Sequence, residues 1–353
     1  LSGKPVHLFN PAPTYRLSGA GGGFGGRGGD AQGQNPPAGA VIYYWLPDAP
    51  SEKVTLDILG PDGKVVRSFN AKPPVNPDAK PDAKQDAKSS EEGEDKEGEA
   101  AADPDGGRRS RPDAKLTLTK GLNRFIWDLR YEKARKLPRM ILWSGDPVGP
   151  MAVPGDYQVR LTVGAETATA PLHVLPDPRS HATPADLAAQ QSFLLAVRDK
   201  LDATHDAIRR IRETREQLET LRKRLAPPTD QKADKTDAQT AATAAVRESA
   251  KTLAAKLTAI EEALYQTKSH SNEDPLNFPV RLNDKLNAVA SSAALGDYRP
   301  TEQAVQVKDQ LSAAIDAELA KLDQIWTHDV PAFNEQARAA GVPSLIVSPS
   351  HLK

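Results

Sequence analysis

The chain has 353 residues, enough for two domains, and its 46 Lys and Arg residues nearly balance its 47 Asp and Glu residues. This balanced, interleaved charge argues against a nucleic-acid or anionic-membrane partner, which would need a clustered positive face. The absence of cysteine excludes disulfides, thiolate metal ligands and a cysteine nucleophile, and no apolar run approaches the roughly 20 residues that span a bilayer.

Residues 1–37 form the first predicted segment, a proline-rich strap followed by a glycine-rich linker. Prolines at positions 5, 11 and 13 separate the apolar residues of the strap. Because proline fixes φ and lacks a backbone donor, we expect extended chain outside any strand ladder. Residues 18–34 contain too few side chains to pack and predict a flexible linker. The chain does not begin with Met, so we expect an upstream segment, where a targeting signal would lie.

Short apolar runs predict strands throughout residues 38–176. Runs such as 41–45 and 157–163 have the two-residue period of half-buried strands. The sequence GPDG at 60–63 indicates a tight turn between two strands. Residues 70–115 lack aromatic side chains and repeat the triplet Asp-Ala-Lys, so we predict a disordered insertion there. Regularly spaced strands, about seven in number, predict an immunoglobulin- or fibronectin-III-like β-sandwich.

The apolar period changes near residue 183 and remains helical for most of the remaining chain. Thr183 followed by Pro184 has the character of an N-cap and a first helical residue. The apolar stripe beyond it repeats every seven residues, which is typical of a coiled coil. Helices are predicted at about 184–226, 246–264, 281–295, 301–326 and 331–340. We therefore predict, over 183–341, an antiparallel helical bundle with a long coiled-coil-like hairpin, followed by a tail at 342–353.

No set of residues has the spacing of a catalytic, cofactor-binding or metal site, so the sequence assigns none of the three. Residues 21–26 match G-x-G-x-x-G by letter, but neither a strand before them nor a helix after them is predicted. The seven histidines are scattered without the i, i+4 spacing of a helical metal site. His205 stands alone on the longest predicted helix, where a solvated or core position is the simpler interpretation.

Three acids leave a hydrolytic alternative open. Asp128, Asp146 and Asp156 lie close in sequence to the aromatic residues Trp127 and Trp143. Two carboxyl groups about 5–10 Å apart are sufficient for glycoside hydrolysis, and exposed aromatic rings can stack on sugars. The simpler interpretation places these acids at strand ends and in turns.

Several phrases of the chain resemble the C-terminal region of large bacterial proteins of the sortilin-type, BNR-repeat class. In the β half they are residues 6–13, 34–37, 40–44, 121–130, 140–143 and 154–157; in the helical half they are residues 274–279, 282–283, 296–298 and 331–333. Phe125, Trp127 and Asp128, with Pro154-Gly155-x-Tyr157, also resemble the immunoglobulin-like domain of flagellar hook-capping proteins.

The resemblance implies that a β-propeller, often labelled a glycosyl hydrolase, precedes this region in an exported protein. The Asp-box repeats of such a propeller, S-x-D-x-G-x-x-W in form, are absent here. We therefore expect a non-catalytic accessory region, extracellular or periplasmic, that docks on or extends the upstream propeller. Part of a glycoside hydrolase and a carbohydrate-binding module remain the alternatives. The candidate interaction surface comprises Phe9, Tyr15, Tyr44 and Trp143, with carbohydrate or another protein as further possible partners.

Overall fold

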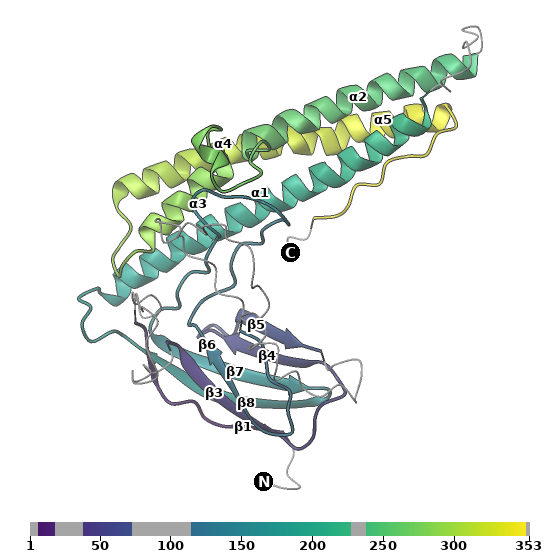
Figure 1. The fold of residues 1–353 in the computed structure, drawn as a ribbon. Helices are drawn as coiled ribbons and strands as arrows, with labels where there is room; N and C mark the ends of the chain where they lie inside the picture. Colours follow the sequence, from purple (N-terminus) through teal and green to yellow (C-terminus); the bar gives the residue numbers. More distant parts are fainter. Residues whose placement is uncertain (1–5, 18–37, 73–113, 227–237, 351–353) are drawn as a thin grey trace, which may run out of the picture. The chain divides into compact units, whose positions relative to one another are not determined.

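A computed structural model of the chain (Figure 1) describes residues 6–17, 38–72, 114–226 and 238–350. The chain forms two compact units. The first unit contains the chain up to Glu132 together with Met151–Pro184, and the second contains Lys133–Pro150 together with the chain from Ala185 onward. The range predicted for the β domain, 38–176, therefore includes a segment that packs within the helical unit. We call Lys133–Pro150 the inserted segment.

The described part of the first unit contains two sheets. Its strands are β1 (His7–Leu8), β2 (Thr14–Tyr15), β3 (Ala40–Leu46), β4 (Val54–Leu59), β5 (Val65–Ala71), β6 (Gly121–Trp127), β7 (Gly155–Val163) and β8 (Glu166–Leu175). One sheet has the order β1-β3-β6 and is antiparallel. The other, β2-β8-β7-β4-β5, is curled and mixed, because β2 runs parallel to β8 while the other pairs are antiparallel.

The core of the β unit follows from strand alternation. On β3 the side chains of Ala40, Ile42, Tyr44 and Leu46 are buried while those between them face outward, as the two-residue period requires. The turn predicted at 60–63 is confirmed: it joins β4 to β5, and Gly60 N–H donates to the Lys64 carbonyl at 2.9 Å.

The predicted immunoglobulin- or fibronectin-III-like sandwich is wrong. The structure has a curled five-stranded mixed sheet and a separate three-stranded sheet in place of two facing antiparallel sheets. The proline-rich strap, which we expected outside any ladder, supplies β1 to one sheet and β2 to the other. Alternating burial predicts that a segment is a strand, but it does not determine the partner of that strand or the curl of the sheet.

The helical unit consists of α1 (Pro184–Arg224), α2 (Ala238–Leu264), the short 3₁₀ turn η1 (Asp274–Leu276), α3 (Leu282–Ala293), α4 (Glu302–Gln324), the π-helical turn η2 (Ile325–Asp329) and α5 (Val330–Ala339). Helix α4 begins at an N-cap, because Thr301 Oγ1 accepts the Ala304 N–H at 3.2 Å. No break separates α4 from α5, since η2 continues the one into the other. A separate helix had been predicted there.

The predicted antiparallel bundle with a coiled-coil-like hairpin is also wrong. A coiled coil buries its apolar stripe against another helix. Here two non-helical segments complete the core around α1: the inserted segment buries Met140 and Leu142, and the chain after α5 buries Val342 and Leu345. The sequence pattern could not reveal this, because an apolar stripe on a helix has the same appearance whether a helix or a loop covers it.

The linker predicted at 18–34 lies outside the described residues, as do residues 227–237 and most of the insertion predicted at 70–115. The interval expected between the first two helices ends earlier than predicted, because α2 begins at Ala238 and not near residue 246. Within the described residues, no helix is both long and apolar enough to cross a membrane.

Candidate interaction site

The acids considered for catalysis are each engaged in an ion pair or hydrogen bond. Asp128 Oδ1 accepts from Arg67 Nη1 at 2.9 Å, and Asp156 lies 2.7 Å from His173 Nδ1. Asp146 pairs with Lys136 in the helical unit, whereas the other two acids belong to the β unit. Across the described parts of the chain, no group of three or more His, Asp or Glu side chains is arranged to hold a metal ion.

The four residues of the predicted interaction surface are divided between the units. In the β unit, Tyr15 is 50% exposed, Phe9 is half-buried, and Tyr44 is fully buried. The Tyr44 hydroxyl donates to the Thr117 carbonyl at 2.6 Å, and burial raises the pKa of this phenol. Tyr44 therefore has no surface to offer a ligand. In the helical unit, Trp143 is 52% exposed.

Trp143 lies on a loop whose backbone is held by hydrogen bonds from side chains of α3. Asp284, a buried residue in the first turn of α3, accepts the Trp143 N–H at 2.7 Å through one oxygen and the Ser144 N–H at 3.0 Å through the other. The Ser144 hydroxyl adds a bond of 2.6 Å to the same carboxylate. Asn287, one turn further along α3, donates to Ser144 Oγ and to the Gly145 carbonyl, both at 2.8 Å.

The backbone of this loop is held by hydrogen bonds, whereas the indole ring of Trp143 is exposed. Hydrogen bonds to an ionised carboxylate are stronger than neutral ones, so the backbone on either side of the indole is held in one conformation. A side chain carried on an ordered backbone binds a partner with a smaller loss of conformational entropy than one on a mobile loop. Trp143 therefore stays a candidate anchor for a partner.

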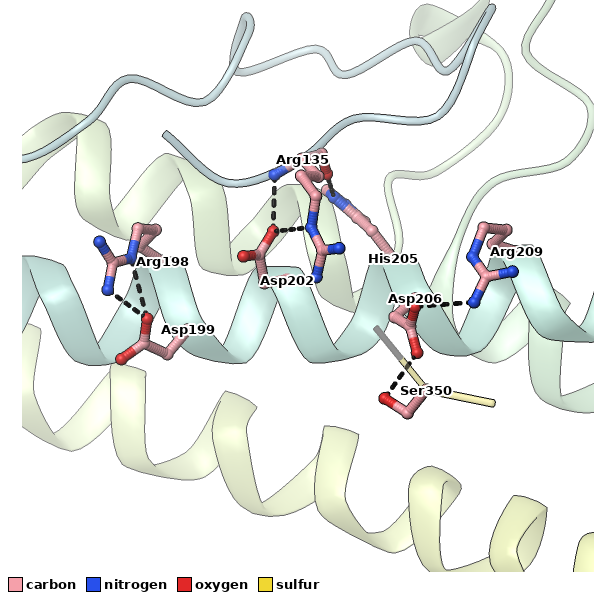
Figure 2. Close-up of polar contacts among 8 residues, drawn as sticks. All are labelled: Arg135, Arg198, Asp199, Asp202, His205, Asp206, Arg209 and Ser350. Atoms are coloured by element: carbon pink, nitrogen blue, oxygen red, sulfur yellow. Dashed lines mark hydrogen bonds and ion pairs between the residues drawn. The ribbon is translucent and has the colours of Figure 1, made fainter. Parts of the chain in front are cut away.

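The start of the inserted segment is held by α1 (Figure 2). Asp202 Oδ1 accepts the Arg135 N–H at 2.6 Å, and His205 Nδ1 lies 2.5 Å from the Arg135 carbonyl oxygen. Since a carbonyl can only accept, Nδ1 carries the proton, and Nε2 is left to accept from Asn283 Nδ2 at 3.3 Å. The imidazole is thus neutral and uses both nitrogens.

The pKa of His205 is lowered, chiefly because the ring is buried. The carbonyl of Arg135 and the charge of Asp202 act in the opposite direction, while Lys136 acts with the burial. His205 is 1% exposed, which confirms the core alternative of the sequence analysis. Its contact with the inserted segment was missed, because nothing in the sequence relates a lone helical histidine to a loop about 70 residues earlier.

Comparison with known proteins gives no relative: no family model, no curated protein and no solved structure matches the chain. The resemblance to the sortilin-type, BNR-repeat class therefore stays a prediction.

Proposed function

We propose that the chain is a non-catalytic interaction module of an exported bacterial protein, and that it docks on a β-propeller through the loop that carries Trp143. The presentation of this side chain carries the proposal: the indole is 52% exposed while buried Asp284 binds the backbone of Trp143 and of the next residue. Binding energy at interfaces is concentrated in a few aromatic or arginine anchors. The propeller as partner comes from the sequence resemblance.

A binding titration with a matched control tests the docking proposal. A purified propeller of the sortilin-type class is titrated with the full chain, with Trp143→Ala and with Val148→Ala. Val148 lies on the same inserted segment and is 53% exposed, so it controls for the loss of any exposed apolar group. We expect Trp143→Ala to weaken binding about tenfold or more and Val148→Ala to leave it unchanged. Equal affinity for all three proteins, or no binding by any of them, would refute the proposal.

Carbohydrate binding is the second candidate, because an exposed indole on a hydrogen-bonded backbone also suits the apolar face of a sugar ring. To test it, the full chain and the Trp143→Ala variant are each titrated with soluble glycans, and the change in tryptophan fluorescence is compared between the two proteins. A saturable signal that is lost in the variant favours a glycan, and flat curves remove this candidate.

The glycosidase alternative has less support, because Asp128 and Asp146 are paired with Arg67 and Lys136. A full-length protein carrying Asp128→Asn and Asp146→Asn should keep any glycosidase turnover that the parent has. A loss of turnover in a folded variant would favour the enzymatic alternative.

A further inference from the structure

The chain after α5 lies along α1 as a non-helical segment (Figure 1). Residues 342–350, here called the tail, belong to neither sheet nor helix. Their backbone polar groups therefore need partners from elsewhere, and side chains of α1 and α5 provide several of them.

Two side-chain amides each donate a hydrogen bond to, and accept one from, the backbone of a single tail residue. Asn334 of α5 donates to the Leu345 carbonyl at 3.1 Å and accepts the Leu345 N–H at 2.7 Å. Gln217 of α1 donates to the Ile346 carbonyl at 2.7 Å and accepts the Ile346 N–H at 2.9 Å. A primary amide carries a donor and an acceptor together, so it recognises a peptide backbone whatever the side chain attached to it.

Two arginines of α1 extend this backbone recognition. Arg210 Nε donates to the Ser348 carbonyl at 3.0 Å, and Arg209 Nη2 reaches the Pro349 carbonyl at 3.4 Å. Arg210 also lies over the ring of Trp326, with 5.3 Å between its guanidinium carbon and the ring centroid. Trp326 belongs to the π-helical turn η2, a type of irregularity that is frequent at functional sites.

The contact points follow one another along α1 in the order of the tail residues. At the far end Ser350 Oγ donates to Asp206 Oδ2 at 2.9 Å (Figure 2). From Gln217 to Asp206 the helix rises about 16 Å, and an extended chain covers about 13 Å between Ile346 and Ser350. The helix is about 3 Å longer than the extended chain over this stretch, a difference that the long side chains of Gln217 and the two arginines can span.

Three apolar side chains of the tail are buried or half-buried. Val342 and Leu345 are 7% and 6% exposed within the helical core, and Val347 is half-buried against it. Ile346, between the last two, is 76% exposed. The surface of α1 and α5 that the tail covers, here called the groove, thus combines hydrogen bonds to the tail backbone with buried positions for Val342 and Leu345 and a half-buried position for Val347. Extended peptides are generally recognised by this combination of backbone hydrogen bonds and apolar contacts.

We propose that this groove is a binding site for an extended peptide with apolar residues at the positions of Val342, Leu345 and Val347, and that the tail occupies it as an intramolecular ligand. A tethered segment competes at an effective concentration on the order of millimolar. A peptide from another protein therefore binds when it outcompetes the tail or when the tail is weakened. This proposal is independent of the docking proposed for Trp143.

The first test uses a fluorescent synthetic peptide of residues 341–350 and the full chain. Leu345→Asp in the protein weakens the tail and leaves the groove residues intact, so we expect the labelled peptide to bind this variant at least tenfold more tightly than the wild type. Adding Gln217→Ala to the variant should reduce the affinity at least fivefold, whereas adding Glu216→Ala, an exposed neighbour on α1, should not. Affinities that do not differ between these proteins would overturn the proposal.

The second test does not depend on the folding of Leu345→Asp. The chain has no cysteine, so Ile346→Cys, at an exposed position, accepts a single spin label on an otherwise unchanged tail. An excess of unlabelled 341–350 peptide should displace the tail and raise the mobility of the label, while a peptide with Asp in place of Leu345 should not. If the mobility of the label stays constant up to millimolar concentrations of peptide, the tail is a permanent part of the fold and the groove does not exchange its ligand.

Discussion

The carboxylate of Asp284 accepts the backbone N–H of Trp143 at 2.7 Å, so a buried acid on α3 fixes the chain that carries an exposed indole. Asp284→Ala removes the acceptor of three hydrogen bonds and should destabilise the helical unit by about 2 kcal/mol. It should also release the loop, which increases the rotational mobility of the indole. Urea unfolding followed by far-UV circular dichroism and time-resolved tryptophan anisotropy measure the two effects.

Asp309→Ala is the control for that change, because Asp309 is an exposed acid on α4 that pairs with neighbouring Lys308. This variant should shift neither measurement. If Asp284→Ala also leaves the loop as rigid as in the wild type, the support assigned to the carboxylate is wrong.

The stability of the helical unit should fall in mild acid because of His205. Burial lowers the pKa of its imidazole below the ordinary value of 6.5. Below about pH 6.5 the unfolded chain therefore binds a proton that the folded chain does not, and stability decreases as the pH falls toward the folded-state pKa. Protonation would also remove the acceptor that Nε2 offers to Asn283. Urea unfolding at pH 7.5 and 5.0 gives the difference.

The matched variants for this pH effect are His205→Gln and His328→Gln, the second at an exposed position of η2. We expect His205→Gln to lose less stability than the wild type between the two pH values, and His328→Gln to behave as the wild type does. An equal acid sensitivity of all three proteins would assign the effect to other groups.

Glu261 on α2 joins the two long helices. Its carboxylate is 3% exposed and pairs with Arg212 at 2.6 Å and with Arg215 at 2.5 Å. Glu261→Gln keeps the shape and removes the charge, which leaves two arginines without their buried counter-ion. Because each arginine is about one-third exposed to water, the cost should be about 2 kcal/mol, below that of a fully buried pair. Glu248→Gln, at an exposed pair with Lys251, should cost much less in the same urea titration.

Tyr44 was predicted on the interaction surface but lies in the core, and a substitution can test this difference. Its hydroxyl donates to the Thr117 carbonyl at 2.6 Å from a fully buried ring. Tyr44→Phe should destabilise the β unit by about 1 kcal/mol and leave every binding measurement proposed for Trp143 unchanged. A loss of binding without a loss of stability would show that Tyr44 takes part in the interaction and is not only a core residue.

Local structure was predictable where the apolar period is regular. The run at 41–45 lies within β3, and the stripe after Pro184 became α1. The order of the strands was not predictable, because β1 and β2 are two-residue ladders in a proline-rich segment that has no strand period.

The candidate interaction site was predictable only in part. The aromatic candidate Trp143 is exposed as expected, but its support by Asp284 depends on two segments 141 residues apart in the sequence. The contacts of the tail were missed for a similar reason. Leu345 lies in a short segment without periodicity, and its backbone partner Asn334 has the sequence appearance of an ordinary helix-surface residue.

The assignment of Lys133–Pro150 to the helical unit has a topological consequence. The polypeptide passes between the units three times: after Glu132, after Pro150 and after Pro184. A protease that cuts only between Pro184 and Ala185 would therefore not release two separate domains, because the inserted segment packs in the helical unit and stays covalently joined to the β unit at both its ends. During synthesis the inserted segment emerges before α1 and α3, which hold it, so the helical unit cannot reach its final form until those helices have been made.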